Sequence, residues 1–399
     1  MIRAAAAALL ATLLGAHAAF AQLPSLRGYY QNVPIWSDAT GFAVGGISDF
    51  NRLRLMTTPV LGEFSLQVAY EQFLVYSQRT EERRGLIFGS VVPSGGEWLD
   101  LQWTIKETDH IDWRHRFDRL NLEYVPNDIL GIIVGRQAIS WATTLLLTPA
   151  DPFSPFNPSD PFREYRAGVD AVRVQVFPGP LSSLDLVVRP TKTTTFRGIV
   201  KEQLTALGRG QTVWKNWEVS GWGGVLYDQP ALAIGASGSV GSVALRGEAS
   251  LREDDGNPVL RAAIDLERLF KLLGRDLYVL LEYQHDGFGA SGPREYPRVV
   301  TSAPFARGEL QVLGQDEIAG QTSWQLHPLW ATSLLVLWNL NDGSALLVPG
   351  ASYSASNEVT LQAGMFLGLG DDTPQIDEPI PSEYGIVPVT LYLALSAFF

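Results

Sequence analysis

The sequence predicts an all-β fold, a single transmembrane antiparallel up-and-down β-barrel of about 16 to 18 strands that follows a cleaved signal peptide. Three observations predict it: a secretory signal at the start of the chain, alternating apolar and polar runs of about ten residues along the rest, and a last run that ends on an aromatic residue. The chain has 399 residues, 46% hydrophobic and 18% charged. It is therefore too apolar to be disordered and carries fewer charges than a typical soluble domain.

Residues 1–21 have the three-part pattern of a secretory signal peptide. Met1-Ile2-Arg3 is a short basic start, Ala4 to Ala16 is apolar, and Ala19-Phe20-Ala21 is a small-x-small cleavage site. The apolar run is shorter than the ~20 residues of a membrane-spanning helix, which argues against a membrane anchor. We therefore expect residues 1–21 to be removed and residues 22–399 to form the barrel.

Alternation with a period of two residues continues along the chain. Between Val243 and Arg252, for example, Val, Leu, Gly, Ala and Leu alternate with Ala, Arg, Glu, Ser and Arg. Runs of this kind match the ~9–11 residues of a tilted membrane-spanning strand with lipid on one face. Because the apolar residues would face lipid, we expect no conventional core. Similar runs occur at Phe64–Tyr76, Leu99–Lys106, Asp118–Tyr124, Leu260–Glu267 and Val359–Leu369.

Turn residues separate these runs, as an antiparallel meander requires. Between Thr191 and Lys215 the up-and-down order does not close, which leaves room for one further strand. The turns include Pro126-Asn127-Asp128, Pro178-Gly179-Pro180, Asp228-Gln229-Pro230, Asp254 to Asn257, Asn341-Asp342-Gly343 and Ser356-Asn357.

The last alternating run, Val389 to Phe399, ends on Phe399. Such an ending resembles the signal that outer-membrane barrels present to the barrel assembly machinery, so we expect Phe399 to act as the assembly signal. The chain also has 11 Trp and 13 Tyr, which barrels of this kind place in girdles at the two membrane interfaces. Candidates near strand ends are Trp36, Trp98, Trp141, Trp324, Trp330 and Trp338.

The segment 149–162 departs from the alternation. Its prolines, at 149, 152, 155, 158 and 161, recur every third residue, which is the period of polyproline II. A second ridge of such a rod would carry Phe153, Phe156 and Phe162, and a third would carry Asp151, Ser154, Asn157 and Asp160. We expect the long Pro/Phe-rich loop 139–169 either to fold into the barrel and narrow it or to lie on the rim, held by its Phe side chains.

Two sets of residues are candidates for the pore. Because the signs of the inward charges balance, we expect these charges to pair and to leave a hydrated path for neutral or zwitterionic solutes. The constriction, expected within Asp151 to Arg173, would use residues in and around the loop, namely Arg136, Trp141, Asp151, Phe153, Phe156, Asp160, Arg163, Arg166, Asp170 and Arg173. The lumen-facing candidates on strands are Arg246, Glu248, Arg252, Arg261, Asp265, Glu267 and Glu282.

The motifs Gly135-Arg136-Gln137, Trp141 and Gly168-Val169-Asp170-Ala171 flank this loop. They resemble motifs of porin-like Gram-negative outer-membrane proteins, a poorly characterised group broadly similar to alginate-export-type and substrate-specific porins. The resemblance implies a barrel in the outer membrane, surrounded by lipids and lipopolysaccharide, that passes a small hydrophilic solute. It identifies no solute and leaves a homo-oligomer open.

The sequence thus predicts a porin-like channel rather than an enzyme, with no cofactor, metal site or nucleic-acid partner. The net charge of −12 disfavours nucleic acid, and the absence of Cys excludes thiolate metal sites. A barrel that serves as sheath or docking partner of an export, secretion or respiratory complex stays open. An outer-membrane hydrolase is the least favoured alternative, because the spacing of His285 and Ser291 does not fit an activated serine and Asp109-His110-Ile111-Asp112 fits a hairpin tip.

Overall fold

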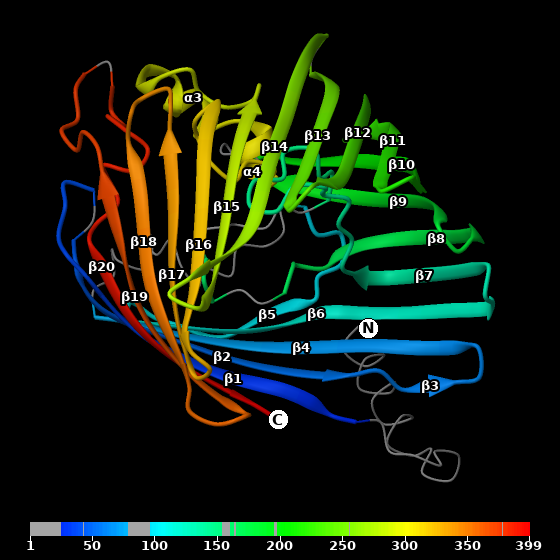
Figure 1. Ribbon diagram of the computed structural model, residues 1–399, viewed down its shortest axis with the longest axis horizontal. Helices are drawn as coiled ribbons and strands as arrows, with labels where there is room; N and C mark the ends of the chain where they lie inside the picture. The colour runs from blue at the N-terminus through cyan, green and yellow to red at the C-terminus, as the bar shows by residue number, and fades with distance from the viewer. Residues whose placement is uncertain are drawn as a thin grey trace.

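The computed structural model describes residues 25–42, 44–78, 96–153, 160–162, 165–194, 198–254, 256–376 and 378–399. The expected signal peptide, residues 1–21, lies outside them. Eighteen strands of the described chain form a closed antiparallel barrel (Figure 1). β1 (Arg27–Ser37) closes the ring by pairing with β20 (Thr390–Phe398). The predicted all-β, up-and-down barrel and its range of strand numbers are confirmed.

The other barrel strands follow one another around the ring in chain order. They are β2 (Gly46–Thr57), β4 (Phe64–Ser77), β6 (Ile111–Asn127), β7 (Leu130–Gln137), β8 (Val169–Gly179), β9 (Ser182–Thr194), β10 (Val200–Trp214), β11 (Trp217–Leu226), β12 (Gln229–Val240), β13 (Val243–Asp254), β14 (Asn257–Leu272), β15 (Arg275–Asp286), β16 (Asp316–His327), β17 (Trp330–Asn339), β18 (Ala345–Ser354) and β19 (Val359–Leu369). β9 and β10 form a direct hairpin, so the further strand considered between Thr191 and Lys215 is absent from the described residues.

Two short strands are not among the eighteen strands of the closed ring. They are β3 (Val60–Leu61) and β5 (Gln102–Glu107). β5 pairs only with β6 among the described strands, so the expectation of a membrane-spanning strand at Leu99–Lys106 is wrong. The physical reason is a competing contact, because the backbone N–H groups of Trp98 and Leu99 both donate to the buried carboxylate of Asp170. This contact draws the start of the run to the inside of the barrel.

The two ends of the barrel differ. The end where β1 begins and β20 finishes has two-residue turns, such as 241–242 between β12 and β13 and 273–274 between β14 and β15. Leu273 and Gly274 have positive φ angles of 51° and 76°, as a type I′ turn requires. We call this the turn end. The opposite loop end carries long connections, among them 138–168, 287–315 and 370–389, and this asymmetry is typical of membrane barrels.

The connection 287–315 contains the only helices of the described chain, η1 (Pro293–Glu295), α3 (Tyr296–Val300) and α4 (Ala303–Ala306). Figure 1 shows α3 and α4 at the end of the barrel where β15 finishes. None of these helices is long and apolar enough to span a membrane.

Alternation assigns the two faces of the strands. On β13, Glu248 and Arg252 are buried inside the barrel, whereas Leu251 is 43% exposed on the outside. The outer surface is strongly apolar, and Ile234 and Leu393 are more than 60% exposed. Trp36, Trp330 and Trp338 are also exposed near strand ends, but Trp141 is 3% exposed.

The expectation that the chain has no core is wrong. Two apolar clusters fill part of the barrel interior, because the long connections fold inward and cover apolar side chains on the inner faces of the strands. Each large side chain buried in this way contributes about 1.5–3 kcal/mol. We call one cluster the β1 cluster; it includes Val33, Phe50, Phe73, Leu147, Phe162, Leu337, Phe366 and Tyr392. The other, the β9 cluster, includes Ile139, Trp141, Phe153, Val187, Leu207 and Trp222.

Candidate functional site

The connection 138–168, which we call the inward loop, leaves the wall at the end of β7 and returns at the start of β8. Gly135 has a φ of +119°, and a Cβ there would lie 2.3 Å from the carbonyl oxygen of Leu120. Glycine is therefore required at this irregular position. Next to it, Arg136 is 1% exposed and donates to Asp170 through Nε to Oδ1 and Nη2 to Oδ2, both at 2.8 Å. This bidentate pair joins the two strands at the base of the inward loop.

The first part of the inward loop, residues 138–153, crosses toward β9 to β12. Trp141 donates from Nε1 to Oδ2 of Asp185 on β9 at 3.1 Å, and its ring packs edge-on against Phe153 at 4.8 Å between centroids. Asp185 also accepts from Arg173 at 2.8 Å. These contacts place Trp141, Phe153 and Arg173 on one wall of the lumen.

Asp151 connects the two parts of the inward loop. It is 4% exposed, and its carboxylate accepts from Ser140 Oγ at 2.9 Å and from Nη1 of Arg166 at 2.8 Å. Since Ser140 precedes the crossing and Arg166 follows it, Asp151 ties the beginning of the loop to its end.

Glu248, on β13, accepts hydrogen bonds from the backbone of the inward loop. Its Oε2 accepts from the N–H groups of Thr143 and Thr144 at 2.5 and 3.2 Å, and its Oε1 accepts from that of Ala150 at 3.0 Å. The loop comes this close to the wall because Gly235, on β12, has no side chain. A Cβ there would lie 2.2 Å from Oγ1 of Thr143.

Glu282, on β15, lies two strands farther around the wall and also accepts hydrogen bonds from the backbone of the inward loop. Its Oε2 accepts from the N–H groups of Leu145 and Leu146 at 3.2 and 3.1 Å, and its Oε1 accepts from that of Leu147 at 2.5 Å. Both glutamates were predicted to face the lumen, and both do. Neither pairs with a cation among the described residues, which differs from the expected pairing of inward charges.

The second part of the inward loop, residues 160–168, reaches the opposite wall. The carbonyl oxygen of Phe162 accepts from Nη1 of Arg52 on β2 at 2.8 Å, and the Phe162 ring packs edge-on against Tyr392 on β20 at 4.8 Å. The N–H of Gly168 donates to Asp118 on β6 at 3.2 Å. The inward loop therefore crosses the lumen and is anchored on both sides, and it does not lie on the rim.

The expected polyproline rod is only partly described. Pro155 and Pro158, together with Phe156 and Arg163, lie outside the described residues. At the described ends of the rod, Phe153 belongs to the β9 cluster and Phe162 to the β1 cluster. Because residues 154–159 lie outside the described residues, the ridge that would join these two rings stays a prediction. Asp160 accepts from the N–H of Phe162 at 3.0 Å.

Most of the other lumen candidates form ion pairs. Arg246 donates to Asp265 at 3.0 Å and to Glu267 at 2.6 Å, both on the neighbouring strand, and Arg261 donates to Asp286 at 2.7 Å. Arg252 instead pairs at 2.5 Å with Glu309 of the connection 287–315.

The connections 287–315 and 370–389 also fold inward. Gln311 accepts from the N–H of Thr148 at 2.6 Å and donates to the carbonyl oxygen of Leu146 at 2.7 Å, so it braces the inward loop. Glu383 accepts from the N–H groups of Leu313 and Gly314 at 2.6 and 2.9 Å. Burial raises the pKa of Glu383 to about 7, although these hydrogen bonds oppose the shift.

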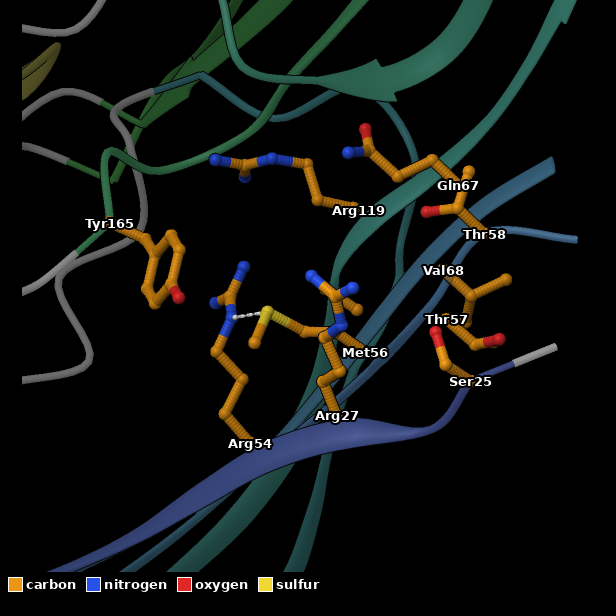
Figure 2. Close-up of a pocket in the computed structure, with 11 residues that line it drawn as sticks. Ser25, Arg27, Arg54, Met56, Thr57, Thr58, Gln67, Val68, Arg119 and Tyr165 are labelled. Atoms are coloured by element: carbon orange, nitrogen blue, oxygen red, sulfur yellow. Dashed lines mark hydrogen bonds between the residues drawn. The ribbon is translucent and has the colours of Figure 1, made fainter. Parts of the chain in front are cut away.

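A pocket of about 480 Å³ lies between the inward loop and the wall formed by β1, β2, β4 and β6 (Figure 2). Arg27, Arg54 and Arg119 line it together with Tyr165 of the inward loop. Arg54 is held by Glu71 and by Asp118, and its guanidinium lies 4.4 Å from the centre of the Tyr165 ring.

None of the residues predicted for the pore lines this pocket. The alternation of β2 and β6 turns Arg54 and Arg119 inward, whereas Arg27 at a strand start and Tyr165 in a loop carry no such signal in the sequence. Arg27 is exposed and makes no ion pair with a described residue. It is thus a free cation in the pocket.

The residues considered for the hydrolase alternative make separate contacts. His285 faces away from the lumen and contacts Asp316 through Nδ1 at 2.9 Å, while the N–H of Ser291 donates to Glu295. His110 contacts the carbonyl oxygen of Ser77 at 3.0 Å. Among the described residues, no three His, Asp or Glu side chains gather in a way that could hold a metal ion.

The fold is similar to that of solved barrels. OccAB1 of Acinetobacter baumannii matches with a TM-score of 0.56 and 8% identity over 94% of this chain and 96% of that one. OccD3 of Pseudomonas aeruginosa matches with a TM-score of 0.51 and 12% identity over 94% and 91%. OpdK of Pseudomonas aeruginosa, solved with vanillate, matches with a TM-score of 0.51 and 10% identity over 94% and 98%. No protein family model and no curated protein matches the sequence.

Proposed function

We propose that this protein is an outer-membrane channel for small hydrophilic solutes and that the inward loop is its constriction. One observation carries the proposal: a closed barrel with an apolar outer surface contains a loop anchored on opposite walls of its lumen. A loop held in this way limits the size of what passes, while the apolar surface contacts lipid and the lipid part of lipopolysaccharide. OpdK, whose fold is similar, is an outer membrane protein.

Small organic anions are the solutes that the pocket fits best. Arg27 is free to meet a solute, and Arg54 and Arg119 lie beside it (Figure 2). A guanidinium group recognises a carboxylate through paired hydrogen bonds, and the Tyr165 ring offers a face for stacking. The complex of OpdK with vanillate, an aromatic carboxylate, supports the same class. This replaces the expectation of neutral or zwitterionic solutes, because the inward loop occupies the carboxyl groups of Glu248 and Glu282.

Planar bilayers test the proposal. The purified barrel is expected to conduct and, in a salt gradient, to show a reversal potential that favours anions. Replacing residues 142–166 by a short Gly-Ser linker keeps the Arg136–Asp170 pair and is expected to increase the conductance. Arg27→Gln is expected to reduce the anion preference, with Lys271→Gln as a control because Lys271 is exposed and paired with Asp276 at the turn end.

If neither the wild-type barrel nor the variant with the Gly-Ser linker conducts, the proposal is wrong. If it then co-purified in fixed ratio with a second protein, the docking role would become the better interpretation. If the barrel conducts but shows no preference for anions, the channel function stands and the assignment of small organic anions as solutes is wrong.

A further inference from the structure

Glu248 and Glu282 are buried inward carboxyl groups that are held by backbone N–H groups of the inward loop. They are 5% and 1% exposed, and neither makes an ion pair with a described residue. By contrast Glu267, on β14 between them in the ring, pairs with Arg246 and accepts from the hydroxyl of Tyr278. Burying a carboxylate without a cation is unfavourable unless other donors surround it.

Backbone amides supply those donors. Six N–H groups of the inward loop point at the four carboxyl oxygens of the two glutamates, three toward each residue. Every oxygen accepts at least one of them, which matches the acceptor oxygens of a carboxyl group, whereas an amide would turn its NH2 group toward N–H donors. All six amides belong to residues 143–150, a stretch that contributes Leu146 and Leu147 to the β1 cluster and Ala150 to the β9 cluster.

The two glutamates therefore determine where this stretch lies. Leu146 and Leu147 enter the β1 cluster, whereas Trp141 and Phe153, on either side of the stretch, enter the β9 cluster. Between the two clusters the chain runs along the wall from β12 to β15, and the carboxyl groups hold it there. Without them, the N–H groups of Thr143, Thr144, Leu146 and Leu147 would lose the carboxylate acceptors that hold this stretch.

We propose that Glu248 and Glu282 are positioning residues that set the bore of the constriction by holding residues 143–150 against the wall, and that they contribute little to charge selectivity. This inference rests on the proposed channel function. Because both carboxyl groups are enclosed by the loop they bind, a passing ion does not meet them directly. Glu267, with a side chain 22% exposed, faces the lumen more openly.

Three matched variants distinguish an effect on the position of the inward loop from an effect on the charge of the lumen. They are Glu248→Gln, Glu282→Gln and Glu267→Gln. Each removes one inward carboxylate and keeps the size of the side chain. At positions 248 and 282 the new NH2 group would face backbone N–H donors, so the inward loop loses its anchor. At position 267 the inward loop is not touched.

A labelling measurement reports on the loop independently of conduction. The chain has no Cys, so Thr144→Cys places a single thiol at a site that is 3% exposed. We expect Glu282→Gln and Glu248→Gln to raise the labelling rate of this thiol by about tenfold or more, because each leaves buried donors unsatisfied and favours local opening. Glu267→Gln is expected to leave the rate unchanged.

Bilayer recordings complete the test. Glu282→Gln and Glu248→Gln are expected to change the unit conductance with little shift of the reversal potential, and Glu267→Gln is expected to do the opposite. Equal labelling in all three variants, or a reversal potential that shifts most in the 248 and 282 variants, would overturn the inference. If the wild-type barrel does not conduct, the proposed function fails, and the labelling rates still decide whether the glutamates position the loop. A strand-type circular dichroism spectrum confirms that each variant is folded.

Discussion

Arg136 and Asp170 show how a single buried pair can organise a long loop. The guanidinium of Arg136 also meets Glu97 at 3.0 Å and the carbonyl oxygen of Leu99 at 2.7 Å, so it joins β7, β8 and the segment before β5. Removing one member of a buried pair leaves the other charge without compensation, which usually costs far more than the pair itself contributes.

Arg136→Ala is therefore expected to destabilise the barrel by about 3–5 kcal/mol. Adding Asp170→Asn removes the uncompensated charge, and the double variant is expected to recover part of that loss. Urea unfolding followed by tryptophan fluorescence measures both. A double variant less stable than Arg136→Ala would show that Asp170 acts mainly through its bonds to the N–H groups of Trp98 and Leu99.

Gly235 is a second position where one atom decides the structure. A methyl group there would collide with Thr143, so Gly235→Ala is expected to push residues 143–144 away from Glu248 and to cost about 1–3 kcal/mol. Gly320→Ala is the control, since a Cβ at Gly320 meets nothing within 4 Å. Equal unfolding midpoints for the two variants would contradict the close approach of the loop.

At the scale of elements, strands and connections differ in how far the sequence predicts them. The strands follow from alternation, because lipid and lumen impose a period of two on every residue that crosses the barrel. The same alternation turned Glu248 and Glu282 inward correctly. It did not find their partners, because amides carry no side-chain signal and lie 98 to 137 residues away in the chain. Leu99–Lys106 alternates like a membrane-spanning strand, but this region forms only the short strand β5, because the N–H groups of Trp98 and Leu99 donate to Asp170.

The connection 370–389 is expected to loosen as the pH rises. The pKa of Glu383 is raised to about 7 by burial, so the packed connection favours the protonated group. Protonated Glu383 therefore stabilises the connection fully below pH 4.5, the usual pKa of a glutamate, and this stabilisation is lost as the pH rises to about 7. Proteolysis or hydrogen exchange of residues 371–388 should therefore be slower at pH 5 than at pH 8, and Glu383→Gln should remove most of this difference.

Glu309 in the connection 287–315 provides the opposite case. Burial alone would raise its pKa, but Arg252, Arg307 and Arg261 lower it to about 2. Its contribution is therefore complete above pH 4.5 and is lost only as the pH falls toward 2. Residues around Glu309 should show no change between pH 5 and 8. A parallel change in both connections would indicate a general loosening of the barrel rather than titration of Glu383.

At the scale of the whole molecule, composition acquires a different meaning. The high apolar content serves two surfaces, an outer one exposed for contact with lipid and an inner one covered by the inward connections. The connections cover apolar side chains and some charged ones, such as Glu248 and Glu282, whereas Arg27 and Arg246 stay more exposed. A whole-chain count of charges, balanced or acidic, does not report which of them a solute can reach.

Phe399, the last residue, concerns the whole molecule because its position bears on both the closure and the assembly of the barrel. Phe399 exchanges two backbone hydrogen bonds with Gly28, at 2.8 and 2.9 Å, while its side chain is 58% exposed. If the ring is the signal for the assembly machinery, Phe399→Ala should lower the amount of barrel in the outer membrane and leave the backbone closure intact. The stability of the refolded variant should then stay within about 0.5 kcal/mol of the wild type.

Phe398→Ala is the matched control, because Phe398 also lies at the end of β20 but packs against Tyr29 at 5.9 Å between centroids. Its loss should reduce stability in urea more than it reduces assembly, the reverse of Phe399→Ala. Deleting Phe399 removes both backbone bonds and should affect both measurements. If Phe399→Ala assembled normally in cells while Phe398→Ala did not, the signal would depend on the packed ring, and the terminal aromatic would serve closure alone.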